Sequence, residues 1–250
     1  MLKKGLLVLI IAVLVAGGAF AQKSFSSMAK NTVTVDVAPT IAGFVAGPLG
    51  SKAAGLVTDN ISDIKSSGFS IAAQYERQLI KQLSVAVRGV YGMPEVKFSY
   101  VDSGVTGNPD LNMTSIAGEG HVRFYPLGET FFLDGMVGYA LLSTDLSGKV
   151  AYLGQATNAT AKESSNYFKY GLKTGWRMSF GNNGGFTFEP AIGYYMGIPL
   201  GDALGKKVSA SLSKQFAGNK VPGIEEAFSV LETFAFIGGP RLSLAFGYRF

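Results

Sequence analysis

The segment that decides the fold is the closing stretch Gly239 to Phe250, which reads GPRLSLAFGYRF. Every second residue from Leu242 to Phe250 is apolar or aromatic, and the residues between them are small, polar or charged. Successive side chains of a β-strand point to opposite faces, so this segment predicts a strand with one apolar face and one polar face. The fold then depends on whether the same alternation recurs along the chain.

The alternation does recur, and long connections alternate with short ones between the alternating segments. Long connections cover residues 48–67, 98–109, 143–165 and 199–232, and short turns separate the other segments. Short turns on one side and long loops on the other are typical of outer-membrane barrels. The strands predicted from the alternation cover residues 32–47, 68–79, 83–93, 113–126, 131–142, 166–180, 186–198 and 239–250.

The sequence therefore predicts an all-β fold, an eight-stranded antiparallel transmembrane β-barrel with long extracellular loops. An open sheet edge is not tolerated in lipid, so the first and last strands should pair and close the ring. In the last connection, Val208, Leu212 and Phe216 are spaced by four, which predicts one or two short amphipathic helices.

The two faces of the predicted strands differ sharply in charge. One face carries Val, Ile, Leu, Phe, Tyr and Met and is almost free of charge, whereas nearly all the charged side chains fall on the other face. A basic side chain at the lipid midplane costs about 2–4 kcal/mol, so a lipid-facing surface should lack such groups. A soluble β-protein with its apolar face inside is the alternative for each strand taken alone. The alternation of loop lengths favours the barrel, as does an export signal at the N-terminus.

The N-terminal region has the features of a secretory signal peptide. Lys3 and Lys4 precede the apolar run Leu6 to Val15, and Ala19-Phe20-Ala21 is a small-residue cleavage site. The run is shorter than the ~20 apolar residues that a membrane-spanning helix needs. We expect a signal peptide at residues 1–21, cleavage after Ala21, and a barrel domain at residues 22–250 in the outer membrane of a diderm bacterium.

The charged residues on the polar face should line the interior of the barrel. An eight-stranded barrel is just wide enough for its side chains to fill it or to hold one small ligand. The charges could form a structural plug of ion pairs, since an unpaired buried charge is costly. They could instead form a gate that rearranges to pass ions. The predicted lumenal charge cluster comprises Asp36, Glu76, Arg88, Glu119, His121, Arg123, Asp134, Lys169, Lys173, Arg177, Glu189, Arg241 and Arg249.

Near the outer ends of the strands, the inward positions are apolar instead. This change suggests a pocket that opens to the cell exterior and is closed on the periplasmic side. The candidate lining residues of this outer pocket are Phe44, Val90, Leu142, Tyr195 and Ile237.

Little in the sequence points to catalysis or to a bound cofactor. The chain contains no cysteine and a single histidine, His121, with no second histidine as a companion. We expect no enzymatic activity, no cofactor and no metal, with His121 acting as a hydrogen-bond partner inside the barrel. The formal net charge of +5 is modest and no basic run is dense, so nucleic acid is not an expected partner.

Two stretches resemble the small eight-stranded outer-membrane barrels of the OmpA/OmpW type. They are the C-terminal LAFGYRF and the hairpin VRFYPLGETFFLDGMVGYA. The resemblance implies that the terminal Phe250 is read by the barrel-assembly machinery. It also implies a small hydrophobic ligand that enters from outside and leaves sideways into the membrane lipid.

Two functions follow from these expectations. The first is a small passive channel or carrier for small, hydrophobic molecules, similar to the OmpW-like proteins. The second is a non-conducting structural or surface-interaction barrel that acts through its extracellular loops, as an adhesin would. Ion conductance in planar bilayers separates the two.

Overall fold

The structure, a computed structural model of the chain, describes residues 31–37, 61–102, 105–127, 130–152, 155–180, 185–216, 225, 228 and 238–250. The predicted signal peptide and the first predicted long loop up to residue 60 lie outside these residues. Within them, no helix combines the length and the apolar character needed to cross a membrane.

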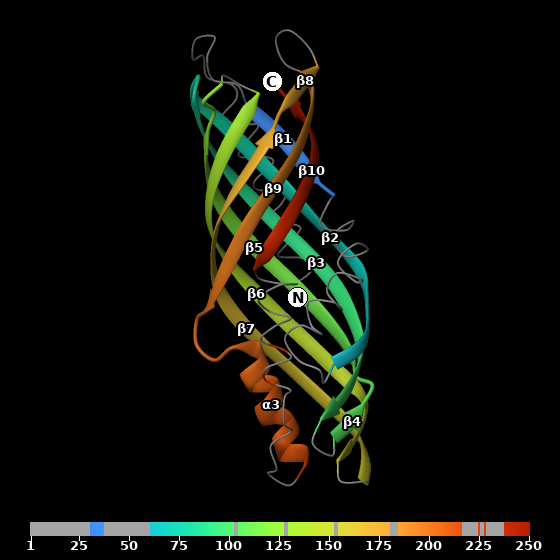
Figure 1. The fold of residues 1–250 in the computed structure, drawn as a ribbon. Coiled ribbons are helices and arrows are strands. Elements are labelled where there is room, and N and C mark those ends of the chain that lie inside the picture. Colours follow the sequence, from blue (N-terminus) through green and yellow to red (C-terminus); the bar gives the residue numbers. More distant parts are fainter. Residues whose placement is uncertain are drawn as a thin grey trace.

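The described strands form one antiparallel ring (Figure 1). Its order is β1–β2–β3–β5–β6–β7–β9–β10, and β10 pairs again with β1. Two short strands extend this ring: β4 lies between β3 and β6, and β8 continues β7 along β9. The bounds are β1 Asn31–Asp36, β2 Ile61–Ile80, β3 Leu83–Asp102, β4 Val105–Gly107, β5 Asp110–Phe124, β6 Phe131–Tyr152, β7 Gln155–Trp176, β8 Met178–Phe180, β9 Gly185–Pro199 and β10 Gly239–Arg249.

The seam between the first and last strands closes the barrel as the sequence predicts. Val33 of β1 lies opposite Tyr248 of β10, and Asp36 lies opposite Ala245. Beyond the end of β10, the Phe250 backbone N–H donates to the Asn31 carbonyl at 2.9 Å, and the Asn31 N–H donates to the Phe250 carbonyl at 2.8 Å. The eight-stranded antiparallel barrel is therefore confirmed.

The side chains in the ring part of the barrel point as the alternation predicts. On β6, for example, Leu133, Val137 and Tyr139 are exposed on the outside, whereas Asp134 is buried inside. The same exposed apolar belt continues over the other strands, with Leu172 of β7 73% exposed. A belt of this kind suits contact with lipid and not with water.

The predicted loops 98–109 and 143–165 are largely strands, which corrects the sequence prediction. β6 and β7 pair continuously from Phe131 opposite Trp176 to Tyr152 opposite Gln155. Each has 22 residues, whereas about 9–11 tilted residues suffice to cross a bilayer. The strands therefore continue well past the apolar belt.

The apolar and polar faces exchange sides where the strands leave the belt. On β6 the outward residues after Leu141 become Ser143, Asp145, Ser147 and Lys149, and the inward ones include Leu142 and the buried Leu146 and Val150. In water, a sheet buries its apolar face, whereas in lipid it exposes that face. The outer parts of β5, β6 and β7 thus behave as a soluble sheet built on a membrane barrel.

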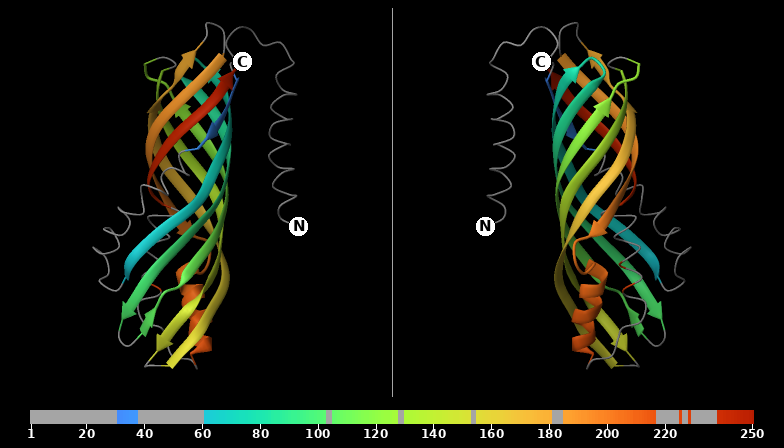
Figure 2. Two further views of the ribbon diagram at one scale, coloured as in Figure 1. Left: turned by 90° about the vertical axis from the view of Figure 1, so that its right-hand side faces the viewer. Right: turned by 90° about the vertical axis from the view of Figure 1, so that its left-hand side faces the viewer.

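The helix α3, Leu204–Gln215, packs on this outer sheet (Figure 2). Leu204, Val208 and Leu212 are fully buried, and they join a cluster with Leu142 and Leu146. The helix lies beside β7, where the Tyr167 hydroxyl accepts a hydrogen bond from the Leu204 N–H at 3.0 Å. One of the predicted amphipathic helices is thus present. The second falls mostly outside the described residues.

The outer parts of β2 and β3 bend away from the barrel axis (Figure 2). Gly68 of β2 lies opposite Pro94 of β3 and has φ of 110°, a conformation that favours glycine. Pro94 has no N–H to donate, and the pairing of β3 with β5 is interrupted between Gly92 and Glu95. These residues give β2 and β3 their curvature at the membrane border.

Candidate functional site: the charged barrel interior

Arg123 is the centre of the buried charge cluster. It points inward from β5, and only 2% of the residue is exposed. Its Nε donates to Asp134 Oδ2 at 2.7 Å, and its Nη1 donates to Glu76 Oε2 at 2.7 Å and to Glu189 Oε2 at 2.8 Å. These carboxylates come from β6, β2 and β9. One guanidinium therefore ties together strands from different sides of the ring.

Arg177 repeats this arrangement from the junction of β7 and β8. Its Nε donates to Glu189 Oε1 and its Nη2 donates to Glu76 Oε2, both at 2.6 Å. Glu76 also accepts hydrogen bonds from the Tyr125 hydroxyl at 2.6 Å and from the Ser84 hydroxyl at 2.7 Å. Two carboxylates and two guanidinium groups thus form a continuous bridge across the barrel interior.

A second layer of charges centres on Glu119 of β5. Glu119 accepts a hydrogen bond from Lys169 Nζ at 2.7 Å and lies 3.7 Å from Arg88 Nε. Arg88 in turn donates to Asp36 Oδ2 at 2.9 Å. Asp36 comes from β1 and also accepts a hydrogen bond from the Ser243 hydroxyl of β10 at 2.6 Å. This layer therefore ties the closing seam to the opposite strands.

His121 links the two layers. Its Nδ1 lies 2.8 Å from Asp134 Oδ1 and its Nε2 lies 3.4 Å from Glu119 Oε2. Lys173 Nζ approaches Asp134 Oδ2 at 3.2 Å. The histidine that the sequence assigns to a hydrogen-bonding role is thus fully enclosed between two carboxylates. The described residues include no group of three or more acidic or histidine side chains placed to hold a metal ion.

All thirteen predicted lumenal residues lie on the inward face, and nearly all are buried. Arg249 donates to Gln78 Oε1 near the end of β10, and Arg241 is half-buried. Four further inward residues, which the sequence did not mark as functional, complete the cluster: Gln74, Ser84, Tyr125 and Phe132. Tyr125 and Phe132 could have been found, since they share the inward parity of Arg123 and Asp134.

The aromatic pair Tyr125 and Phe132 packs against the charges at the short-turn end of the barrel. The Arg123 guanidinium carbon lies 4.4 Å from the Phe132 ring centroid, and the Arg177 carbon lies 5.4 Å from that of Tyr125. Cation–π contacts of this kind are stronger where water is excluded. The two rings therefore cover the layer of charges around Arg123 and Arg177 at the short-turn end.

Of the residues predicted to line an outer pocket, the three that the structure describes are not gathered around an open space. Leu142 has no exposed surface and lies in the apolar cluster around α3, and Val90 packs against that cluster. Tyr195 is buried inside the membrane part of the barrel, closer to the short-turn end, with Lys169 Nζ 5.7 Å from its ring centroid. Phe44 and Ile237 lie outside the described residues. For Val90 and Leu142, a packed core replaces the predicted opening, because α3 supplies apolar side chains to it.

Outside the membrane belt, two surface lysines pair with carboxylates. Lys162 Nζ lies 2.9 Å from Asp145, and Lys97 Nζ lies 3.1 Å from Glu95. The hydrogen bond that Lys97 donates to Glu95 raises the pKa of Lys97, and the one that Lys162 donates to Asp145 raises the pKa of Lys162. These lysines therefore stay charged beside their carboxylates.

A closed antiparallel ring with a lipid-suited belt and a charged interior defines an integral outer-membrane β-barrel. The family model described as autotransporter beta-domain matches residues 44–197, and the chain belongs to this family. The broad class expected from the resemblance in the sequence is thus confirmed, and the family shown is the autotransporter beta-domain. The narrower OmpW-like assignment stays a prediction.

No curated protein matches the chain. Among solved structures, the chain is similar to Ail, the attachment invasion locus protein of Yersinia pestis, with 11% identity and a TM-score of 0.37. The match covers 89% of this chain and 99% of that chain. A second structure of Ail, in complex with the heparin analogue sucrose octasulfate, gives the same values.

Proposed function

We propose that this protein is a non-conducting surface-interaction barrel. Its membrane part is a closed anchor, and its outer sheet with α3 is the part that meets other molecules. The observation that carries this proposal is the set of contacts of Arg123, which join β2, β5, β6 and β9 across the interior. In an eight-stranded barrel, side chains alone can fill the interior.

The size and packing of the outer sheet support the second half of the proposal. Strands of 22 residues run about 70 Å at roughly 3.3 Å per residue, more than twice the thickness of the apolar belt. The buried cluster around α3 gives this part its own apolar core. A rigid sheet of this length suits presentation of a binding surface, because little ordering entropy is lost on binding.

The family name raises passage of a polypeptide through the interior as a second candidate. The bridge of Arg123 and Arg177 to Glu76 and Glu189 counts against it, since every one of these contacts would have to break. Removing single partners from such buried networks costs about 3–5 kcal/mol each. The channel or carrier predicted from the sequence meets the same obstacle.

Planar-bilayer recording tests this proposal. The refolded wild-type protein should insert without stepwise conductance. Arg123→Ala should produce small, cation-preferring steps, because water would replace the guanidinium beside three carboxylates. The Arg77→Ala variant, whose side chain points outward from β2, serves as the control and should stay silent. Regular steps from the wild-type protein would overturn the closed-barrel proposal in favour of the channel.

A further inference from the structure

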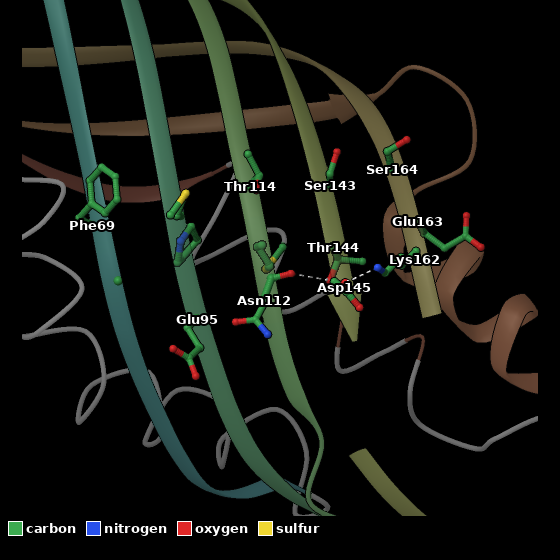
Figure 3. Close-up of a pocket in the computed structure, with 14 residues that line it drawn as sticks. Phe69, Glu95, Asn112, Thr114, Ser143, Thr144, Asp145, Lys162, Glu163 and Ser164 are labelled. Carbon is green, nitrogen blue, oxygen red and sulfur yellow. Dashed lines mark hydrogen bonds and ion pairs between the residues drawn. The ribbon is translucent and has the colours of Figure 1, made fainter. Parts of the chain in front are cut away.

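On the outside of the barrel wall, a hollow lined by both apolar and polar side chains lies at the border of the apolar belt (Figure 3). Its volume is about 740 Å³, within the range of small-molecule sites. Phe69 and Met93, the last belt residues of β2 and β3, form its apolar side. Asn112, Ser143 and Ser164, from β5, β6 and β7, form its polar side.

The hollow exists because the sheet bends. At Gly68 and Pro94 the strands β2 and β3 turn away from the barrel axis, and both residues line the hollow. A Cβ atom on Gly68 would collide with the Met93 carbonyl oxygen, so the backbones approach too closely for any other residue. The concave surface is therefore built into the backbone at the level where lipid headgroups lie.

The chemistry of the hollow fits a sugar better than a phosphate. The hydroxyl groups of Thr114, Ser143 and Ser164 and the amide of Asn112 can each donate and accept hydrogen bonds, as sugar hydroxyls do. The charged lining residues are one cation, Lys162, and three carboxylates, Glu95, Asp145 and Glu163. Lys162 Nζ already lies 2.9 Å from Asp145. Phosphate recognition favours arginine forks or clustered cations. The exposed ring of Phe69 offers a face for the C–H edges of a sugar ring.

A second groove, which is apolar, lies on the same outside face of the barrel, closer to the short-turn end. Its volume is about 770 Å³, and it is lined outward by Val122 of β5, Val137 of β6 and Leu172 of β7. Gly120 and Gly135 form its floor, since they place no side chain on the surface. The rim residues are about half or more exposed.

The spacing of the two sites matches one lipid molecule. From Thr114 in the hollow to Gly120 in the groove, β5 advances six residues, about 20 Å along the strand. With a strand tilt of about 35–45°, this corresponds to a depth of roughly 15 Å, about half of the apolar band. A headgroup in the hollow would thus place the end of its acyl chain in the groove.

We infer that this face of β5, β6 and β7 binds one glycolipid of the outer leaflet, with the saccharide headgroup in the hollow and an acyl chain in the groove. The occupant must be a membrane lipid, because the hollow is continuous with the lipid-facing belt. The bound lipid would hold the outer sheet at a fixed height above the membrane. This inference does not depend on whether the barrel interior conducts.

Lipid retention by the full-length, detergent-purified protein tests the inference. Deep-rough lipopolysaccharide is the sugar-bearing probe and phosphatidylethanolamine is the sugar-free one, and native mass spectrometry counts the molecules retained. Gly120→Leu fills the groove, and its new Cβ would lie 3.9 Å from the nearest atom, so the fold is kept. The double variant Asn112→Ala/Ser143→Ala removes polar groups from the hollow.

Both changes should lower the retention of lipopolysaccharide about tenfold, through lost apolar contact or lost hydrogen bonds. Val35→Leu is the control: it enlarges an outward side chain on β1, away from the proposed lipid site on β5, β6 and β7, and it should retain as much as wild type. Equal retention of lipopolysaccharide by all variants would overturn the inference. A parallel loss of phosphatidylethanolamine in the double variant would also overturn it.

Discussion

Arg123→Ala should lower the temperature at which the folded barrel unfolds by about 10 °C, since breaking a buried ion pair from one side costs about 3–5 kcal/mol and each kcal/mol corresponds to about 2–4 °C in a chain of this size. The substitution leaves Glu76, Asp134 and Glu189 without their shared guanidinium. The midpoint of the heat-dependent change in gel mobility measures this effect in detergent.

The matched control for this prediction is Arg77→Ala. Arg77 lies on β2 next to Glu76, but its side chain points outward. It should therefore change the midpoint by only a degree or two, as surface substitutions do. Arg123→Lys should fall between the two variants, because one ammonium group keeps the charge but cannot reach all three carboxylates in the same geometry. A midpoint equal to wild type in Arg123→Ala would mean that the charge cluster does not stabilise the barrel.

Val208→Asp should detach α3 from the outer sheet and leave the membrane barrel folded. Val208 has no exposed surface and lies in the apolar cluster with Leu142 and Leu212. A carboxylate there loses both packing and hydration, a cost of about 4 kcal/mol. Trypsin can report the change, because α3 contains Lys206, Lys207 and Lys214.

Cleavage within α3 should become about a thousandfold faster in Val208→Asp, since proteolysis follows the population of the locally open state and about 1.4 kcal/mol corresponds to a factor of ten. The shift of the barrel in heat-dependent gel mobility should stay as in wild type. Ala210→Asp, on the exposed side of the same helix, is the control and should be cut at nearly the wild-type rate. If Val208→Asp also abolished the gel shift, the outer core and the barrel would be one cooperative unit and not two.

Much of the membrane barrel could be predicted from the sequence because lipid imposes a strict rule on each strand. Leu133 and Val137 must face outward and Asp134 inward, so the alternation itself gives the face of every residue. The same rule predicts that Arg123, Glu76 and Glu189 all point into the barrel interior. Which carboxylate meets which guanidinium depends on strand register, which the alternation alone does not determine.

The outer sheet was missed for a physical reason that is visible at Leu142. From Leu142 to Val150 the alternation continues, but its apolar residues fall on the parity that is charged within the membrane. If the strand is assumed to face lipid, its outward residues here are polar and the segment resembles a loop. If the strand is assumed to face water, Leu142, Leu146 and Val150 are its buried face. The pocket predicted at Leu142 fails for the same reason, because these inward apolar residues bind the helix α3.

The exchange of faces along β6 is what separates the lipid-facing barrel from the outer sheet, and it can be measured directly. The chain contains no cysteine, so a single cysteine placed at each position from 131 to 151 reports on that position alone. Each variant would carry a nitroxide spin label in liposomes, and its collision rates with oxygen and with a water-soluble nickel chelate would be measured. We predict that odd positions up to Leu141 meet mainly oxygen, that odd positions from Ser143 onward meet mainly the nickel chelate, and that the even positions from Phe132 to Val150 meet little of either. High nickel accessibility at positions such as Leu133 and Val137, or lipid contact at Ser147 and Lys149, would contradict it.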